Sequence, residues 1–173
     1  MPFLQSFPAL VGRAPRVLIL GSMPGTASLL AGQYYAHRQN RFWPLMGELV
    51  GASPGLPYPA RCERLTGSGI ALWDVLARCQ REGSLDSAIR DDTAQANDFA
   101  SLLVSLPTIR TVLFNGTKAE SSFLRFVAPT LDLPGLAYRR LPSTSPANAS
   151  QGTDYKRATW RDALQAGGIA TLI

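Results

Sequence analysis

Residues 16–43 hold the densest group of side chains suited to recognising a ligand. The aliphatic run 17–20 predicts a buried strand that ends at Gly21. The turn that follows consists of Gly21, Ser22, Met23, Pro24 and Gly25. Its glycines permit positive φ angles, so main-chain atoms can approach a ligand closely. Aromatic and amide side chains come next, at Tyr34, Tyr35, His37, Asn40, Phe42 and Trp43. We interpret this stretch as the lip of a binding pocket.

Several common kinds of site are excluded by the sequence. The turn matches neither the dinucleotide-binding glycine pattern nor the phosphate loop that ends in Gly-Lys-Ser/Thr. A Ser-His-Asp hydrolase is disfavoured because His37 is the single histidine and no Gly-x-Ser-x-Gly motif is present. Scattered carboxylates and two cysteines do not make a metal or iron–sulfur site. What remains is a pocket of backbone amides, neutral side chains and aromatic rings, which suits a planar heterocycle and implies no metal or cofactor.

Length, composition and charge indicate which kinds of protein are compatible with this sequence. With 173 residues, 46% of them hydrophobic, the chain is expected to form one domain, 1–173. A net charge of +5 and a pI of about 9.7 favour a polyanionic partner. No apolar segment approaches the roughly 20 residues that a bilayer requires, and the first 16 residues lack the pattern of a secretion signal. We therefore expect a cytoplasmic protein with no membrane partner.

The order of apolar runs and turns predicts an α/β fold. Strands are predicted at 17–20, 70–76, 111–114 and 136–141. Helices are predicted at 41–50, 60–65, 98–106, 118–126 and 154–166, with Thr117 as the N-cap of the fourth. The polar segment 77–97 has no clear pattern. This alternation predicts three layers, α/β/α, around a central four-stranded, mainly parallel sheet. Ligands bind beyond the carboxyl ends of such strands, so 21–25, Asp74, 115–116 and 143–149 should converge.

The motifs in these loops resemble those of the uracil-DNA glycosylase superfamily. Gly-Ser-Met-Pro-Gly at 21–25, followed by Ser28, and Ala-His-Arg-Gln-Asn-Arg-Phe-Trp at 36–43 are similar to the first motif region of its mismatch-specific uracil and thymine glycosylases. Phe-Asn-Gly at 114–116, with Lys118, resembles the turn after their third strand. Leu-Pro-Ser-Thr-Ser-Pro-Ala-Asn at 141–148 lies where they have a second motif. The resemblance covers most of the chain and implies the three-layer fold of that superfamily.

Departures from the pattern indicate one branch. The mismatch-specific enzymes position water with an asparagine third in the turn, where this chain has Met23. More similar is the hypoxanthine (deoxyinosine) DNA glycosylase branch, whose implied catalytic residue is the asparagine before Arg-Phe-Trp. Asn40 matches that residue, although Arg38 replaces the usual proline of the stretch. The resemblance thus implies a monomeric, monofunctional DNA glycosylase that removes deaminated bases, hypoxanthine first and also uracil or xanthine, without a cofactor.

Elementary chemistry agrees with the implied roles. Breaking an N-glycosidic bond develops positive charge on the sugar and negative charge on the base, so the site needs donors aimed at the base and water held near C1′. We expect Asn40 to hold the water, Phe42 to stack on the base and Asn115 to read its polar edge. The expected base pocket is Gly21, Ser22, Met23, Pro24, Gly25, Tyr35, Phe42 and Asn115. The expected DNA-binding residues, with a wedge loop at 143–148, are Ser28, Lys118, Ser143, Thr144, Ser145, Pro146, Ala147 and Asn148.

Other interpretations stay open. Asn40 is also placed to cap the helix that begins at Arg41. Asp74 is a rival group for positioning water, although a structural partner for an arginine is the favoured interpretation. Lys118 and Arg139 are either phosphate contacts or solvated surface charges. For the whole protein, the alternatives are a mismatch-specific uracil or thymine glycosylase, a nucleic-acid-binding module of the same fold without activity, and a hydrolase of free nucleosides.

Overall fold

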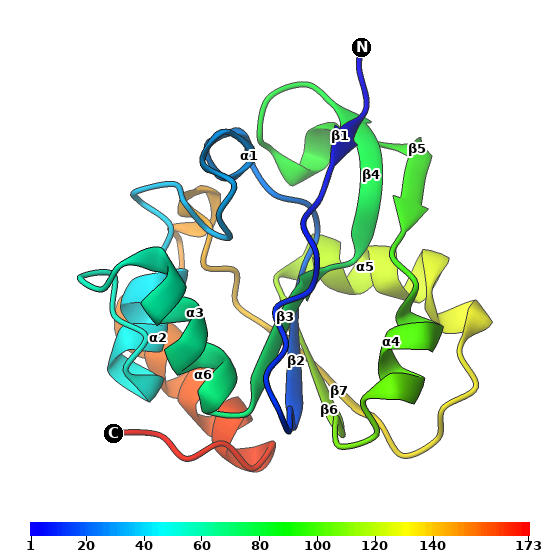
Figure 1. Cartoon of the computed structure of the whole chain (residues 1–173). Coiled ribbons are helices and arrows are strands. Elements are labelled where there is room, and N and C mark those ends of the chain that lie inside the picture. The colour runs from blue at the N-terminus through cyan, green and yellow to red at the C-terminus, as the bar shows by residue number, and fades with distance from the viewer.

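The computed structural model describes residues 1–173 and centres on a four-stranded sheet (Figure 1). In spatial order its strands are β3 (Ile70–Asp74), β2 (Val17–Gly21), β6 (Thr111–Asn115) and β7 (Ala137–Leu141). All neighbouring strands are parallel, and Val17 lies opposite both Ile70 and Thr111. The predicted four-stranded sheet is confirmed. Because every strand runs the same way, all four carboxyl ends lie at one edge.

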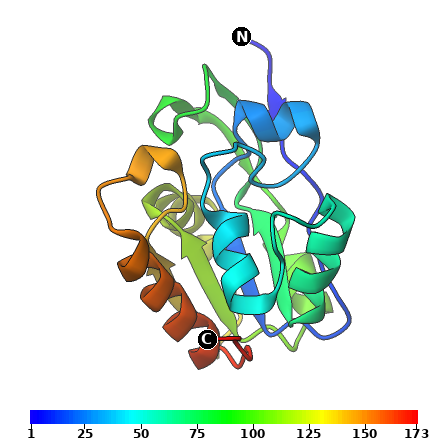
Figure 2. The ribbon, with the colours of Figure 1, turned by 90° about the vertical axis from the view of Figure 1, so that its left-hand side faces the viewer.

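Helices cover both faces of this sheet, as Figures 1 and 2 show. One face carries α2 (Phe42–Val50), α3 (Tyr58–Gly67) and α6 (Thr153–Ala166), and the other carries α4 (Phe99–Ser105) and α5 (Thr117–Phe126). Side chains along a strand alternate between faces, so Val17 and Ile19 enter one apolar cluster while Leu18 and Leu20 enter the other. All four are fully buried. The predicted three-layer α/β/α arrangement is confirmed.

A smaller antiparallel sheet contains most of the segment 77–97, for which the sequence showed no clear pattern. It consists of β1 (Leu4–Gln5), β4 (Leu76–Arg81) and β5 (Ile89–Ala96), and the short 3-10 helix η1 (Asp86–Ala88) joins the last two strands. The prediction of one strand at 70–76 is wrong at its carboxyl end, because β3 stops at Asp74 and β4 begins at Leu76. Register shifts between β4 and β5 interrupt the alternation of polar and apolar residues. The strand pattern of this sheet is therefore weak in the sequence.

The remaining elements are short. A helix not predicted from sequence, α1 (Thr26–Ala31), follows the turn after β2, and 3-10 turns occur at η2 (Ala128–Thr130) and η3 (Pro146–Asn148). The N-cap of α5 is Gly116 and not Thr117, which is the first residue of the helix. Gly116 has a φ of 94°, which favours glycine there. None of the helices has the length and apolar character needed to cross a membrane.

Candidate active site

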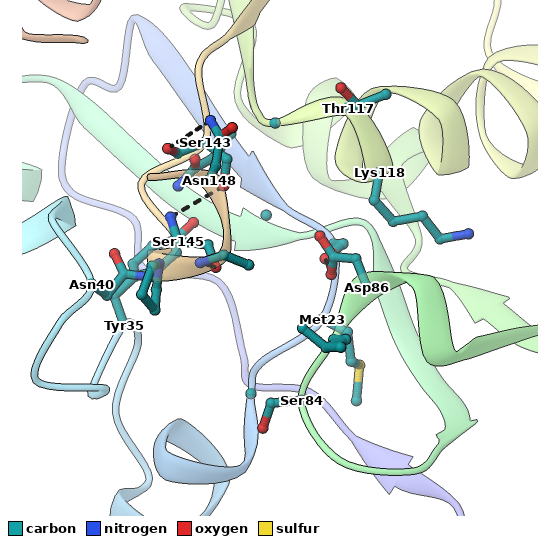
Figure 3. Close-up of a pocket in the computed structure, with 18 of the residues that line it drawn as sticks. Met23, Tyr35, Asn40, Ser84, Asp86, Thr117, Lys118, Ser143, Ser145 and Asn148 are labelled. Atoms are coloured by element: carbon teal, nitrogen blue, oxygen red, sulfur yellow. Dashed lines mark hydrogen bonds between the residues drawn. The ribbon is translucent and has the colours of Figure 1, made fainter. Parts of the chain in front are cut away.

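A cleft of about 1320 Å³ lies at the carboxyl ends of the central strands. Its walls come from the turn after β2, the segment before α2, the β4–β5 connection and the loop after β7. In Figure 3, Asn40 and Tyr35 lie on one side with Ser145, and Met23, Ser84 and Asp86 lie on the other. The strand-end loops converge as the parallel topology predicts. Among the predicted site residues, only Phe42 and Thr144 do not line the cleft.

Asn40 lines the cleft and also caps a helix. Its side-chain oxygen accepts a hydrogen bond from the N–H of Phe42 at 2.9 Å, and its own N–H donates to the carbonyl of His37 at 2.8 Å. The N-cap residue of α2 is Arg41, one residue later than this interpretation placed it, but the side chain of Asn40 makes a cap-type bond to the first N–H of the helix. A carboxamide oxygen has two lone pairs, so the cap leaves one acceptor position free. The two roles considered for Asn40 are compatible, since the cap fixes the orientation of the side chain.

Phe42 is in the core and not in the cleft. It is fully buried, and the ring of Tyr35 stacks on it with the two centroids 4.1 Å apart. The expectation that Phe42 stacks directly on a base is wrong for this arrangement, because Tyr35 lies over it and lines the cleft instead. Tyr35 has a φ of 53°, which is uncommon for a residue other than glycine. Of the two stacked rings, Tyr35 is therefore the one that lines the cleft.

Asn115 and Thr144 are joined by two hydrogen bonds. The amide nitrogen of Asn115 donates to the hydroxyl of Thr144, and the N–H of Thr144 donates to the amide oxygen of Asn115, both at 2.9 Å. Thr144 is fully buried, so the expected DNA contact at this residue is wrong. Asn115 lines the cleft, but both ends of its amide are engaged with Thr144. The structure thus gives Asn115 a bracing role, while one N–H and one lone pair of its amide stay available, and the base-reading role stays a prediction.

Two serines predicted for the site also make internal contacts. The hydroxyl of Ser28, a buried residue of α1, accepts the N–H of Ala36 at 3.1 Å. The hydroxyl of Ser22 donates to Asp86 at 2.6 Å across the cleft wall. Both bonds fix the position of main chain that borders the cleft. Ser28 acts on the segment that leads to Asn40, and Ser22 joins the turn after β2 to the β4–β5 connection.

Asp74, at the end of β3, is 3% exposed and lines the cleft. Its favoured interpretation as the partner of an arginine is wrong, because its Oδ2 has no hydrogen-bond partner and the nearby Arg81 donates to the carbonyls of Pro24 and Gly83. Burial raises the pKa of Asp74 to about 7. The negative charge of Asp86 adds to this rise, and the positive charge of Arg81 opposes it.

The loop after β7 is held by its own serines. The hydroxyl of Ser143 accepts the N–H of Ser145 at 3.1 Å, and the hydroxyl of Ser145 accepts the N–H of Ala147 at 3.2 Å. Asn148 donates to the carbonyl of Ser143 at 3.4 Å. Pro146 and Ala147 are exposed at the tip. This loop therefore presents a small, apolar tip on a hydrogen-bonded base beside the cleft.

Comparison with known proteins places the chain in a family. Residues 8–164 match the uracil DNA glycosylase superfamily. This chain belongs to that superfamily. It is 35% identical over 162 residues to the hypoxanthine DNA glycosylase of Methanosarcina barkeri, which covers 93% of this chain and 98% of the relative. It is 37% identical over 145 residues to the hypoxanthine DNA glycosylase of Methanosarcina acetivorans, with 83% and 87% covered.

A solved structure supports the fold assignment. A solution NMR structure from Methanosarcina acetivorans, assigned provisionally as a uracil DNA glycosylase, matches with a TM-score of 0.78 and 31% identity. The match covers 96% of this chain and 99% of the other. The sequence resemblance to the uracil DNA glycosylase superfamily is thereby confirmed in both sequence and fold.

The lysine and arginine side chains at or near the cleft differ in whether they are already bonded within the protein. Lys118 lines the cleft, but its Nζ lies 2.7 Å from Asp91, which also binds Arg125. Arg139 lines the cleft, is exposed and makes no ion pair. Lys156 is buried outside this cleft and donates to the carbonyl of Asn148 at 2.7 Å. Arg139 is thus a better candidate than Lys118 for a contact with a DNA phosphate.

Sequence reasoning missed the wall contributed by the β4–β5 connection. Ser84, Leu85 and Asp86 line the cleft, and Ser84 accepts the N–H of Thr26 at 2.9 Å. Gly83 is the one glycine inside 77–97, and the pair Gly83-Ser84 is typical of a turn. Because no strands were predicted on either side of it, the sequence did not indicate which elements this turn connects. No group of three or more His, Cys, Asp or Glu side chains in the chain is arranged to hold a metal ion.

Proposed function

We propose that this protein is a DNA glycosylase that hydrolyses the N-glycosidic bond of hypoxanthine in DNA, as a monomer and without a metal or organic cofactor. Uracil and xanthine are further substrates in the proposal. Support comes from membership of the uracil DNA glycosylase superfamily and from two relatives named hypoxanthine DNA glycosylase. The observation that carries the proposal is the carboxamide of Asn40, oriented by its cap bond in the wall of the cleft.

The proposed reaction begins when the damaged nucleotide leaves the base stack and enters the cleft, at a cost of a few kcal/mol. The free acceptor position of Asn40 holds a water molecule near C1′. As the bond to the base lengthens, positive charge on the sugar makes C1′ electrophilic, so the water needs orientation more than a strong base. Main-chain N–H groups of the turn after β2 stabilise the negative charge on the departing base, and the proton that the attacking water loses neutralises that base, which leaves an abasic site and free base. Pro146 and Ala147 fill the space that the base leaves.

The proposed enzyme is monofunctional, so water and not an amine attacks C1′. The chain has only two lysines. Lys118 is held by its ion pair with Asp91 and Lys156 is bonded to a carbonyl and lies outside the cleft, so neither amine is free to attack C1′ as a Schiff-base mechanism requires. Treatment with borohydride during turnover should therefore trap no covalent complex between protein and DNA.

The deciding test is excision from a labelled oligonucleotide that contains one deoxyinosine opposite thymine. Under single-turnover conditions, hot alkali should cleave the strand after incubation with the wild-type protein. Asn40→Ala should slow abasic-site formation by about 100-fold or more, because a positioned group of this kind contributes that much. The matched control is Gln39→Ala, an exposed neighbour that does not line the cleft. Equal rates for the wild type and Asn40→Ala would falsify the role of Asn40.

The same assay separates the rival functions. Uracil, xanthine and mispaired thymine in place of hypoxanthine rank the substrates. A binding module of the same fold would hold the oligonucleotide and release no base from any of them. A nucleoside hydrolase would split free inosine at least as fast as deoxyinosine in DNA. Because Asn40→Ala also removes a helix cap worth about 1 kcal/mol, each variant is assayed below its own unfolding transition.

A further inference from the structure

Asp74 and Tyr35 border the same small space at the floor of the cleft. Oδ2 of Asp74 and the hydroxyl oxygen of Tyr35 are both buried and without a hydrogen-bond partner. Both residues line the cleft. A Cβ placed on Gly21 would collide with Oδ1 of Asp74 and would lie 3.0 Å from the hydroxyl of Tyr35. The absence of a side chain at residue 21 therefore gives these two groups a shared space.

Two unpaired polar groups in one place are costly for stability alone. Each buried donor or acceptor without a partner costs about 1–3 kcal/mol, and native proteins leave few of them. The left-handed backbone of Tyr35 adds strain, and the stack on Phe42 keeps its ring in position. Strained residues and unpaired groups concentrate at sites that a ligand completes. The arrangement therefore points to a ligand with polar groups that match this pair.

The chemistry of the pair defines that match. A tyrosine hydroxyl donates a hydrogen bond, and a carboxylate only accepts. Next to each other they complement a ring C=O beside a ring N–H, which is the lactam edge of hypoxanthine and of uracil. Adenine and cytosine, the bases from which these two arise by deamination, carry an amino group and a bare ring nitrogen at the same positions.

We infer that Asp74 and Tyr35 read the lactam edge of the extruded base: the Tyr35 hydroxyl donates to the exocyclic oxygen, and the Asp74 carboxylate accepts the ring N–H. This inference rests on the proposed glycosylase function and deepens it. Asn115 also lines the cleft, but one N–H and one lone pair of its amide are already bonded to Thr144, whereas the two groups of this pair have no partner. Guanine has the same edge, so its rejection depends on other walls of the cleft.

The charges around the pair are consistent with this reading. Asp86 on η1 and Arg81 on β4 are the charged groups that act on Asp74, and neither forms a hydrogen bond with it. A pKa of about 7 leaves a large carboxylate fraction at neutral pH. An N–H donor bound to Asp74 favours the ionised form further, since a hydrogen bond to a carboxylate lowers its pKa.

The first test needs no variant of the protein. Wild-type single-turnover excision is compared for hypoxanthine, for 1-methylhypoxanthine, which lacks the N1–H, and for unsubstituted purine, which lacks both the 6-oxygen and the N1–H. Each change should slow excision by about 10- to 100-fold, because it leaves a buried group of the pair unpaired. If hypoxanthine is excised and both analogues react at the same rate, the inference is wrong while the proposed function stands. If the wild type excises no base at all, the proposed function itself fails.

The second test couples protein and substrate changes. Tyr35→Phe removes only the hydroxyl, so it should slow hypoxanthine excision about tenfold and leave purine excision unchanged. Asp74→Asn removes the charge at equal volume, so it should slow hypoxanthine excision about tenfold and have a smaller effect on 1-methylhypoxanthine. A loss that is equal for all three bases would assign Asp74 to water activation or to folding and would overturn the reading role. Circular dichroism checks that each variant is folded, and the wild-type series decides the question if one is not.

Discussion

Asn115 and Thr144 exchange two hydrogen bonds between the end of β6 and the loop after β7, and the carbonyl of Thr144 accepts the N–H of Arg41 at 2.9 Å. Three segments far apart in sequence thereby meet at one threonine: the β6 turn, the loop with the exposed tip and the residue before α2. Because Asn40 directly precedes Arg41, the wedge loop and the proposed water-holding group share one brace. The geometry of the site therefore depends on a residue that no substrate can touch.

Removal of the Thr144 hydroxyl should weaken the fold and the site together. Thr144→Val keeps the shape of the side chain but leaves the amide nitrogen of Asn115 buried without an acceptor. We expect a loss of about 1–3 kcal/mol in the free energy of unfolding, measured by urea denaturation. The exposed Thr108→Val is the control and should change it by less than about 0.5 kcal/mol. Equal midpoints for the two variants would show that the brace contributes nothing.

A methyl group at Gly21 should block the floor of the cleft. In Gly21→Ala the new Cβ collides with Asp74 and closely approaches Tyr35, so one of these groups must move. Crowding of this kind costs about 1–3 kcal/mol of stability, and we expect deoxyinosine excision to fall by at least about tenfold. Gly67→Ala is the matched control, because a Cβ there meets nothing within 4 Å. Normal excision by Gly21→Ala would contradict the crowded floor.

Much of this arrangement follows from residue patterns alone. The runs at 17–20 and 111–114 are short, apolar and followed by glycine, which is sufficient to indicate buried parallel strands with ligand-binding turns after them. The order of those turns then places most of the cleft. The helix ends were also predictable, with differences of one or two residues at 58–67 and 99–105.

The errors have physical causes in the tertiary structure. Phe42 and Tyr35 are both aromatic residues near the turn, and only the packing of the folded chain determines which of the two lines the cleft. The left-handed backbone of Tyr35 is not visible in the sequence. Thr144 belongs to a polar loop, yet it turns inward to Asn115. The β4–β5 wall was missed because long-range pairing, and not local alternation, determines those strands.

Arg139 should contribute to DNA affinity through phosphate and not through the base. Its guanidinium is exposed at the cleft and has no acidic partner, so it can release counterions from DNA. Arg139→Ala should reduce the slope of log affinity against log salt by about 0.9. Lys118→Ala should reduce it less, because Asp91 already neutralises that lysine. Fluorescence anisotropy with an undamaged duplex measures both slopes.

The control for this salt series is Arg13→Ala, which removes an exposed arginine that does not line the cleft. Its slope should equal that of the wild type. If Arg13→Ala and Arg139→Ala reduced the slope equally, the effect would come from total charge, and the phosphate contact would have to be sought elsewhere on the surface.

Asp74 should make the stability of the protein depend on pH in an unusual direction. Its carboxyl has a pKa of about 7 in the folded chain against an ordinary value of 3.8, so the folded state binds more protons between these values. Stability is therefore greatest below pH 4 as far as this group is concerned, and it falls as the pH rises towards 7. The difference between the two pKa values corresponds to an upper bound of about 4 kcal/mol.

Asp74→Asn removes the titration and keeps the volume of the side chain. Urea denaturation of the wild type and of Asp74→Asn at intervals from pH 4 to pH 8 gives the difference in unfolding free energy at each pH. That difference should shift in favour of the variant as the pH rises, and it should level off above pH 7. Taking the difference between the two proteins cancels the contributions of the other titrating groups. A constant difference across the range would mean that Asp74 ionises in the folded protein as it does in the unfolded chain.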